Sequence, residues 1–343
     1  MSKGNINYKY LRRRKSWLRR NLATVIAVIL ILFIIVVCGV IASMKIFNYG
    51  IFKPTQTQPT PVKTQEESTT AKDVVWIEDK ENIEEKVNYT PPEDVSLPYF
   101  IMVNRAANCV TIYGIDKEGS YTIPVIAFAA SCGREGNETI VGENYTTTDK
   151  YEWRLMVDGT YGHYAFRIDG GYLFHSVPYM AIDNNTLEEG EFNKLGSFAS
   201  LGCVRMCVRD VKWLYDNCPS GTKVTIYDNE SNPGPLGKPE TIKIPEDSPN
   251  KGWDPTDPNE NNPWLKSKAA IKNAKNVTTK VGVKVDLKKD VTAVDTCGND
   301  ISAKVQTIGK YTFDMAGEYE IKYKVTDAIG STAIETIKLI VEE

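Results

Sequence analysis

The stretch Ser200-Leu201-Gly202-Cys203-Val204-Arg205-Met206 places a thiol directly after a glycine, at the head of a segment with helical periodicity. Apolar residues recur at helical spacing with charged residues between them, which predicts a helix over 204–216. The positive end of a helix stabilises a thiolate relative to a thiol. Cys203 is therefore a candidate nucleophile. The amides of Gly202 and Cys203 are expected to be free at the helix start to hold a developing oxyanion.

Composition narrows the chemistry that the chain can perform. Its 343 residues leave room for two domains and accessory segments. The net charge is −3, and no broad basic surface run lies outside residues 1–20, so nothing indicates nucleic-acid binding. The only histidines are His163 and His175, so a mechanism that needs an imidazole has two candidates. Seven cysteines form no CxxC pair, which argues against a structural zinc site. Free buried thiols and disulfides both remain open.

The N-terminal segment has the pattern of a membrane anchor. Residues 1–20 carry eight basic side chains and no acid, and residues 22–44 are 23 uncharged residues. That length crosses ~30 Å of hydrocarbon as a helix. The excess of basic residues before it puts the N-terminus in the cytoplasm and the rest of the chain outside. We predict a cytoplasmic tail over 1–21 and a single transmembrane helix over 22–44; a cleaved signal peptide is the alternative.

Strand patterns dominate the middle of the chain. After a Thr/Gln/Pro-rich extracytoplasmic stalk over 45–96, alternating apolar residues predict a β-rich domain over 97–228. Within it, the turn at 169–171 predicts a hairpin that pairs Phe166 with Phe174 and Ile168 with Tyr172. In that register the two histidines of the chain share one face.

A second β-domain follows a proline-rich segment. Residues 229–269 are rich in Pro, Asn, Gly and Asp and are expected to form a linker. Alternation over 281–287, 319–325 and 337–341 predicts a small β-sandwich within residues 270–343. The expected fold class is mainly β: an N-terminal transmembrane helix, a β-rich sandwich with one helix after the candidate cysteine, and a C-terminal immunoglobulin-like sandwich.

The candidate cysteine needs a base to raise its thiolate fraction and to protonate a leaving amine. His175 ends a predicted strand, where its side chain can face a cleft, and is the better candidate. A cysteine, an imidazole and backbone donors together indicate acyl transfer through a thioester. Taken singly, Cys203 is equally typical of a small buried apolar residue, and His163 of a structural histidine. By the same reasoning Arg205 is a solvated helix charge, and Ser176 and Ser200 are turn and cap residues.

Two elements together resemble the L,D-transpeptidase catalytic domain family. That family has an upstream histidine and a Ser/Thr-His-Gly-Cys-x-Arg/Asn element, which Phe174-His175-Ser176 and Ser200–Arg205 match. The resemblance covers residues 97–228. Leu201 stands where the family commonly has a second histidine, and the segment 131–142 only loosely resembles a Thr-Pro-x-Gly segment of the family. The C-terminal segment looks like the immunoglobulin-like modules of Gram-positive surface proteins.

The resemblance implies peptidoglycan cross-linking outside the membrane, in a Gram-positive-like cell wall, without a cofactor or metal. Cys203 would attack a donor tetrapeptide stem and release D-Ala, with His175 as base and then acid. The remaining expected site residues support the oxyanion and the loop or bind substrate: Gly202, Ser176, Ser200 and Arg205 in the first role, Tyr179 and His163 in the second. The expected partners are peptidoglycan stem peptides and, through the N-terminal helix, the cell membrane; the ligand of the C-terminal module is left open.

Two other functions fit the same sequence. Water in place of the acceptor amine would make the chain an L,D-carboxypeptidase. A chain with an idle catalytic fold would be a wall-binding or adhesion protein that acts through its C-terminal module. The presence of Cys203, His175 and Gly202 weighs against the second alternative.

Overall fold

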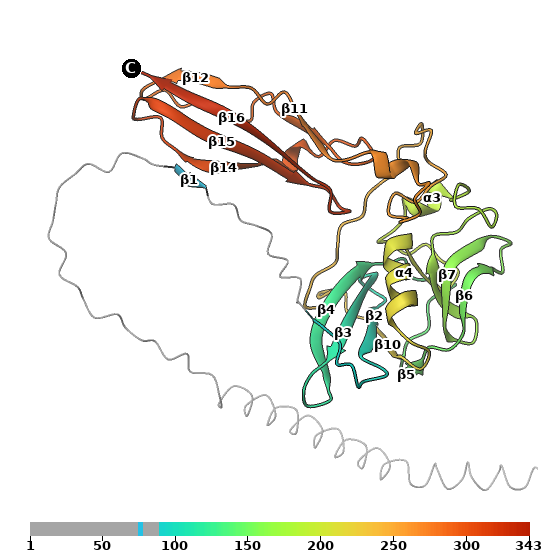
Figure 1. Ribbon diagram of the computed structural model, residues 1–343. Coiled ribbons are helices and arrows are strands. Elements are labelled where there is room, and N and C mark those ends of the chain that lie inside the picture. The colour runs from blue at the N-terminus through green and yellow to red at the C-terminus, as the bar shows by residue number, and fades with distance from the viewer. Residues whose placement is uncertain (1–74, 78–88) are drawn as a thin grey trace, which may run out of the picture. The chain divides into compact units, whose positions relative to one another are not determined.

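The computed structural model describes residues 75–77 and 89–343 (Figure 1). The predicted cytoplasmic tail over 1–21 and transmembrane helix over 22–44 lie outside these residues. Among the helices that are described, none has the length and apolar character needed to span a membrane.

The β-rich domain predicted over 97–228 contains two sheets. The first sheet has five strands in the order β4-β3-β2-β10-β5. Its strands are β2 (Tyr99–Asn104), β3 (Cys109–Ile115), β4 (Tyr121–Ala129), β5 (Gly142–Thr146) and β10 (Lys223–Tyr227). Strands β2 and β10 pair in parallel, which brings the end of the domain back to its beginning. The apolar alternation that predicted these strands faces the core: Ile101, Val110 and Ile112 have no exposed surface.

The second sheet has four strands in the order β6-β7-β8-β9. They are β6 (Lys150–Leu155), β7 (Tyr161–Asp169), β8 (Tyr172–Ser176) and β9 (Val204–Met206). The predicted pairing of Phe166 with Phe174 is confirmed. The pairing of Ile168 with Tyr172 is wrong, because the ladder shifts after Arg167 and Tyr172 lies opposite Asp169. The extra residue in β7 is a β-bulge next to the hairpin turn.

The segment after Cys203 is a strand before it is a helix. Val204–Met206 pair in parallel with Phe174–Ser176, and the helix α4 (Val208–Asn217) begins only after Cys207. The predicted helix over 204–216 is therefore wrong at its start. Three residues that match a helical pattern adopt the extended form because β8 offers them backbone partners, and this tertiary pairing outweighs a weak local preference. Cys203 precedes a strand, so the argument from the helix dipole does not apply to it.

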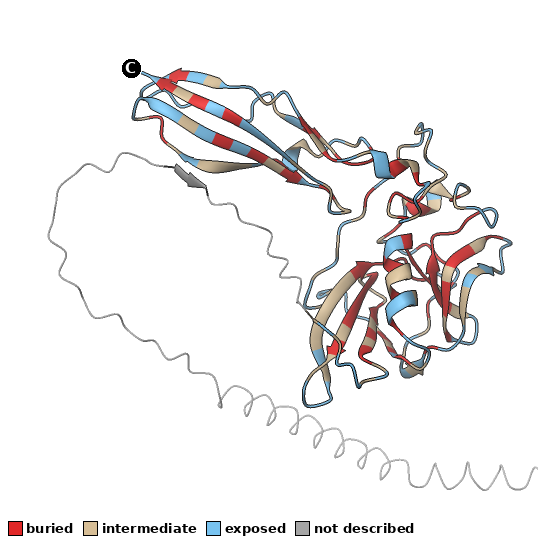
Figure 2. Cartoon of the chain, viewed as in Figure 1, coloured by how far each residue is buried: buried red, intermediate tan, exposed pale blue. Residues whose placement is uncertain are grey.

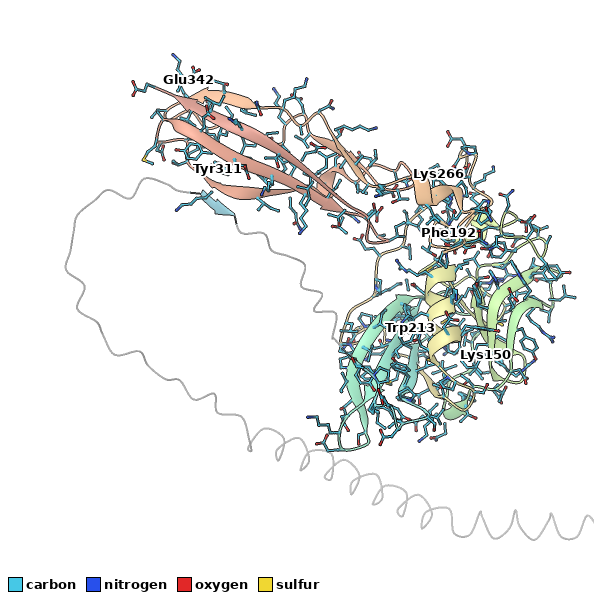
Figure 3. The ribbon with its side chains drawn as sticks, in the orientation of Figure 1. Lys150, Phe192, Trp213, Lys266, Tyr311 and Glu342 are labelled. Atoms are coloured by element: carbon cyan, nitrogen blue, oxygen red, sulfur yellow. The ribbon has the colours of Figure 1, made fainter. Side chains whose placement is uncertain are left out.

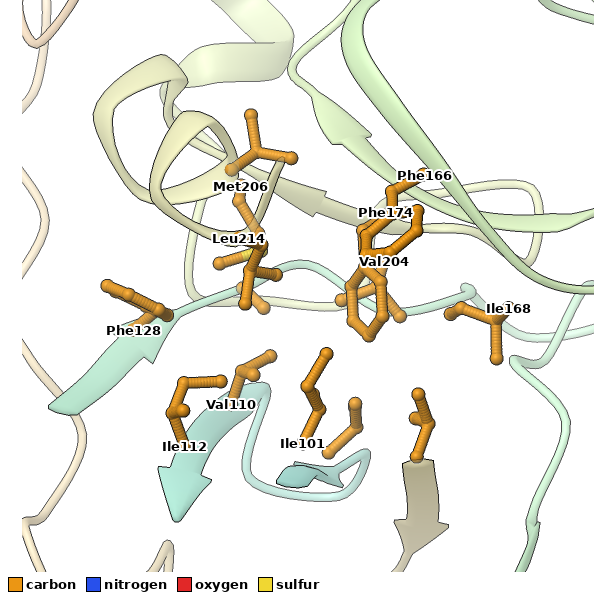
Figure 4. Close-up of a cluster of buried hydrophobic side chains, with 14 of the residues drawn as sticks. Ile101, Val110, Ile112, Phe128, Phe166, Ile168, Phe174, Val204, Met206 and Leu214 are labelled. Atoms are coloured by element: carbon orange, nitrogen blue, oxygen red, sulfur yellow. The ribbon is translucent and has the colours of Figure 1, made fainter. Parts of the chain in front are cut away.

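One apolar core lies between the two sheets and α4. Figure 4 shows its centre, where Phe166, Phe174 and Val204 from the second sheet face Ile101 and Val110 from the first. Trp213, labelled on α4 in Figure 3, extends this core with its ring 5.2 Å from that of Tyr99. The second sheet thus covers one of its faces with the core and leaves the other face free to carry polar residues.

The proline-rich segment is packed against the domain before it. Residues 229–266, called the strap from here on, contain no strand and end in the 3-10 helix η1 (Pro263–Lys266). Ile242, Ile244 and Trp264 of the strap are buried with Phe192 in a second apolar cluster. Phe192 ends the short helix α3 (Glu189–Phe192). A segment expected to be a linker therefore supplies part of a core.

Backbone and side-chain hydrogen bonds fix the strap. The Asn193 side chain donates to the Ile244 carbonyl and accepts from the Ile244 amide, each over 2.8 Å. The amide of Val208 at the start of α4 donates to Oδ2 of Asp254 over 2.8 Å, so a strap residue caps this helix. The strap therefore follows an irregular path in which hydrogen bonds to neighbouring elements take the place of a regular backbone ladder.

The C-terminal domain is the predicted β-structure. Its main sheet has the order β1-β14-β15-β16-β12, and β11 pairs with β13 beside it. In Figure 2, buried and exposed positions alternate along β15 and β16 as the sequence predicted. The strands are β1 (Val75–Ile77), β11 (Ala270–Lys272), β12 (Val277–Lys280), β13 (Thr292–Val294), β14 (Gln306–Tyr311), β15 (Gly317–Thr326) and β16 (Thr332–Glu342); a 3-10 helix, η2, spans Ser302–Lys304.

Two details of this domain differ from the sequence-based expectation. The strand expected over 281–287 is instead β12, which ends at Lys280, and Val281 and Val283 are exposed. Strand β1 lies within the predicted stalk and pairs antiparallel with β14. Part of the stalk therefore adds an edge strand to the C-terminal sheet.

Candidate active site

A pocket of about 190 Å³ opens on the polar face of the second sheet, and Cys203 and His175 both line it. Leu173 and His175 come from β8, Cys203 precedes β9, and Arg205 lies within β9. Successive side chains of a strand point to opposite faces, so residues two apart share a face. The intervening Phe174 and Val204 accordingly point into the apolar core. Strand alternation thus places the thiol and the imidazole on one surface.

A glycine makes room for the imidazole. Gly162 of β7 lies beside His175, and a Cβ atom at this position would come within 2.8 Å of His175 Nδ1 and 2.4 Å of Met156 Cε. Real Cβ atoms do not approach so closely, so any larger residue here would displace the ring. Position 162, and not 163, therefore faces His175. The expectation that the two histidines share one face is wrong, because His163 points to the opposite side of β7, with its ring stacked on those of Trp153 and Tyr164 at 3.9 and 3.8 Å.

The thiol of Cys203 favours its protonated form. Burial raises its pKa, and the Leu173 backbone and the Arg205 charge offset this only in part. The sulfur also lies 3.7 Å from the carbonyl oxygen of Gly171, which can accept the S–H proton. The thiol therefore needs a base at the moment of attack.

The imidazole of His175 is neutral at physiological pH. Burial lowers its pKa to about 3, with a further contribution from the nearby Arg205 charge. Its Nδ1 atom is buried and makes no hydrogen bond to the described residues. The imidazole is therefore in the unprotonated form that a general base needs in order to accept a thiol proton, and it lines the same pocket as the thiol.

The loop before Cys203 is held by one hydroxyl. Ser200 is fully buried; its Oγ donates to the Cys203 carbonyl over 2.5 Å and accepts the Gly202 amide over 3.1 Å. The Gly202 amide is therefore not free to hold an oxyanion, contrary to the expectation from sequence. The Cys203 amide donates to none of the described residues and remains the available backbone donor. Gly202 has a φ of +117°, which disfavours any residue with a side chain.

The segment Ser131–Gly133 braces this loop from the other side. The amides and carbonyls of Ser131 and Arg205 exchange hydrogen bonds of 2.8 and 3.0 Å. The Cys132 carbonyl accepts the amides of both Ala199 and Ser200 at 3.0 Å. The sequence of this segment only loosely resembles the family, because backbone hydrogen bonds of this kind do not require particular residue types.

Arg205 is a buried cation with acidic partners. Its side chain is 8% exposed, and its Nη1 atom lies 2.6 Å from Glu191 Oε2. Asp158 lies 4.0 Å from its Nη2 atom. The alternative interpretation of Arg205 as a solvated helix charge is therefore wrong: it lies in a strand, pairs with α3 and lines the pocket beside His175.

Comparison with known families gives this arrangement a context. Residues 98–226 match the family model described as the L,D-transpeptidase catalytic domain (YkuD). The chain carries an L,D-transpeptidase catalytic domain. Residues 269–341 match the model described as the Ig-like domain of bacterial surface proteins.

Parts of the chain are also similar to individual proteins. The putative L,D-transpeptidase YciB of Bacillus subtilis is 35% identical over 114 residues, which are 32% of this chain and 58% of that protein. The chain therefore spans less than two thirds of this curated relative. A solved L,D-transpeptidase from Mycobacterium smegmatis is 17% identical, with 38% of this chain and 58% of that chain covered and a TM-score of 0.30. A fused zinc-dependent amidase/peptidase/peptidoglycan-binding protein of Clostridium acetobutylicum is 23% identical, with coverages of 42% and 57% and a TM-score of 0.30.

Three residues predicted for the site lie away from the pocket of the L,D-transpeptidase domain. Ser176 Oγ accepts the His163 amide and donates to the Val177 carbonyl, so the hydroxyl does not orient the His175 ring; the Ser176 backbone acts on that imidazole instead and offsets part of the fall in its pKa. Tyr179 has no exposed surface and His163 is 3% exposed, and both lie among aromatic rings. In this conformation they cannot touch a substrate, and their role is in packing.

Other residues of the L,D-transpeptidase pocket were missed. Leu201, which replaces a family histidine, is 38% exposed and lines the pocket. The end of β6 and the turn after it supply Arg154 and Asp158. The predicted alternation identified this hairpin as structure, and nothing in its sequence marked it as part of a site. No group of three metal-ligating side chains is found in the described residues.

Proposed function

We propose that this chain is a membrane-anchored peptidoglycan L,D-transpeptidase that works through a thioester on Cys203. The observation that carries the proposal is that Cys203 and His175 line one pocket, His175 from β8 and Cys203 from the residue directly before the adjacent parallel strand β9. Together with the family of the domain, this pairing supports acyl transfer with a cysteine nucleophile.

The first half-reaction transfers the donor acyl group to sulfur. As Cys203 Sγ attacks the carbonyl carbon between the third residue and D-Ala of a tetrapeptide stem, His175 accepts the thiol proton. The Cys203 amide donates to the oxygen that becomes negatively charged. The C–N bond then breaks, His175 returns its proton to the leaving nitrogen, and D-Ala departs with a free amine.

The second half-reaction regenerates the thiol. A side-chain amine of a neighbouring stem attacks the thioester carbonyl while His175 accepts its proton. The C–S bond breaks and the proton passes to sulfur, so the products are an amide cross-link and free Cys203. Water in place of the amine would give a tripeptide, which is the carboxypeptidase outcome.

The proposal also covers where the reaction takes place. The basic residues of 1–20 followed by uncharged residues 22–44 support a single anchor with a cytoplasmic N-terminus. The catalytic domain would then lie outside the membrane, in a Gram-positive-like wall. Protease accessibility of the catalytic domain in intact cells tests this topology, and protection in intact cells together with digestion after lysis would contradict it.

The activity is tested with the full-length chain in detergent and a purified disaccharide-tetrapeptide. Mass spectrometry is expected to find free D-Ala and a cross-linked dimer. Cys203→Ala is expected to abolish both products, and a trapped acyl-enzyme, whose added mass equals that of the donor minus D-alanine, is expected on the native chain only. Unchanged turnover in Cys203→Ala would overturn the assignment of the nucleophile.

The choice of base needs its own comparison. His175→Ala is expected to reduce turnover at least ~100-fold, the range of general base catalysis. His163→Phe, which keeps the aromatic stack, is expected to retain activity. The reverse result would assign the base to His163. Tripeptide without dimer in the wild-type reaction would favour a carboxypeptidase over a transpeptidase.

A further inference from the structure

The pocket beside Cys203 carries an excess of positive charge. Three arginines line it, Arg154, Arg167 and Arg205, against the single acid Asp158. Asp158 lies on the Arg205 side, where Glu191 is also paired. The rest of the pocket therefore presents a positive potential to whatever enters it.

Of these three cations, only Arg154 is uncommitted. Arg167 lies 3.0 Å from Asp149 and also donates to the carbonyl of Gly170, and Arg205 is held by Glu191. Within residues 89–343, Arg154 has no carboxylate partner, and its recorded contact is with an aromatic ring. A cation at a pocket rim without an acid partner is available to an anionic group of a ligand.

An aromatic ring orients the guanidinium of Arg154. Its Cζ atom lies 4.8 Å from the ring centre of Tyr151, whose hydroxyl accepts from Arg167 Nη2 over 3.0 Å. Arg167, fixed by Asp149, thus holds the ring over which Arg154 lies. Stacking of this kind limits the freedom of an exposed arginine and reduces the entropy that it loses on binding.

Strand pairing and one close contact bring Arg154 to the same side of the sheet as the reacting groups. Arg154 of β6 lies opposite Gly162 of β7, the Gly162 position adjoins His175 of β8, and His175 lies opposite Arg205 of β9. Neighbouring strands are ~4.8 Å apart, so the backbones of Arg154 and His175 are separated by about 10 Å. Because Gly162 has no side chain, the side chains of Met156 and His175 lie directly against its backbone, between Arg154 and the reacting groups. A group bound by the Arg154 side chain would lie in the same pocket as a carbonyl held at Cys203.

We propose that Arg154 binds a carboxylate of the donor stem peptide next to the scissile bond, and so makes the enzyme selective for donors in which that carboxylate is free. This inference rests on the proposed function. Two carboxylates of a stem peptide satisfy the chemistry: a side-chain carboxylate on the third residue and the α-carboxylate of the terminal D-Ala.

Three synthetic donors separate the two sources: the free tetrapeptide, the same peptide with the third-residue carboxylate amidated, and the same peptide ending in D-alaninamide. Steady-state kinetics with the full-length chain compare wild type with Arg154→Gln, Arg154→Lys and the exposed control Lys117→Gln. Arg154→Gln is expected to raise KM for the free donor about tenfold, as for loss of one hydrogen bond to a charged group, with kcat within about twofold. Arg154→Lys keeps the charge and is expected to restore part of this loss, and Lys117→Gln to match wild type.

The amidated donors decide which carboxylate is bound. The donor that lacks the recognised carboxylate is expected to show the high KM already with wild type and no further change in Arg154→Gln. If Arg154→Gln weakens all three donors equally, or none, the proposal is wrong. Titration of the same donors into the Cys203→Ala chain gives an independent reading. If Cys203→Ala binds the free donor more tightly than the amidated donor, and Cys203→Ala/Arg154→Gln does not, the binding site is upheld even without turnover. If the affinities are the same with and without Arg154, the proposal is overturned.

Discussion

His175 and Arg205 lie directly opposite each other on the parallel strands β8 and β9, and both side chains line the pocket that holds Cys203. Burial and the fixed positive charge of Arg205 together lower the pKa of His175 to about 3. The sheet therefore keeps the imidazole unprotonated over the whole physiological pH range. Glu191 forms an ion pair with Arg205 and so fixes the position of the positive charge that lowers the pKa of His175.

Gly162→Ala is expected to reduce turnover more than stability. The added Cβ would lie 2.8 Å from His175 Nδ1, so the imidazole must move away from its position beside the pocket. A displaced base loses most of its contribution, about 100-fold in kcat. The matched control is Gly190→Ala in α3, where a Cβ would meet nothing within 4 Å. Steady-state kinetics of both variants with the tetrapeptide donor give the comparison, and equal kcat values would show that the ring tolerates the added methyl group.

Ser200→Ala is expected to lower kcat with little effect on KM. It removes the hydroxyl that joins the Gly202 amide to the Cys203 carbonyl, and it leaves a buried amide without a partner. Such a group costs about 1–3 kcal/mol, which a thermal melt will register. Ser197→Ala removes an exposed hydroxyl that bonds only the Lys194 carbonyl and serves as control. A Ser200→Ala chain with native kcat would mean that the loop keeps its shape without this link.

The strap is expected to be necessary for a stable catalytic domain. A fragment of residues 89–228 lacks the buried side chains of Ile242, Ile244 and Trp264, as well as the Asp254 carboxylate that caps α4. Each buried apolar side chain contributes about 1.5–3 kcal/mol, so the loss is comparable to the whole stability of a domain. Urea denaturation should show a much lower midpoint for 89–228 than for 89–268. If the unfolding curves of the two fragments coincide, the strap does not stabilise the domain and is only a linker.

Histidine burial is expected to make the domain sensitive to acid. Burial, aided by the Lys212 charge, lowers the pKa of His163 to about 4, whereas in the unfolded chain it titrates near 6.5. Between these values the unfolded state binds more protons, so stability falls as the pH drops from about 6.5 to about 4, by about 3 kcal/mol for this residue. His163→Phe keeps the ring stack and removes this titration. Urea denaturation at pH 7 and pH 4.5 should show a smaller loss for the variant, and an equal loss would assign the acid sensitivity to other groups.

Local patterns predicted what depends on local physics. Alternation of apolar residues identified most of the strands of both sheets. Two short sequence elements predicted that Cys203 and His175 act together, and both residues line one pocket. The start of α4 was wrong because three residues before it pair with β8, a partner about thirty residues earlier in the chain. The strap was predicted to be a linker because its composition is that of an irregular segment, whereas its burial depends on partners in the preceding domain, such as Asn193 and Phe192. Arg154 was missed because its position relative to His175 depends on the register across three strands.

The protonated state of Cys203 also determines how this thiol fares between turnovers. Peroxides and disulfides react with thiolates, and a cysteine whose pKa is raised by burial presents little thiolate to them. Five other cysteines of the described chain are buried and free, and they are likewise shielded from exchange. In the proposed location outside the reducing cytoplasm, this raised pKa would protect the nucleophile from oxidation, because in the proposed mechanism the thiol loses its proton only when an acyl donor arrives.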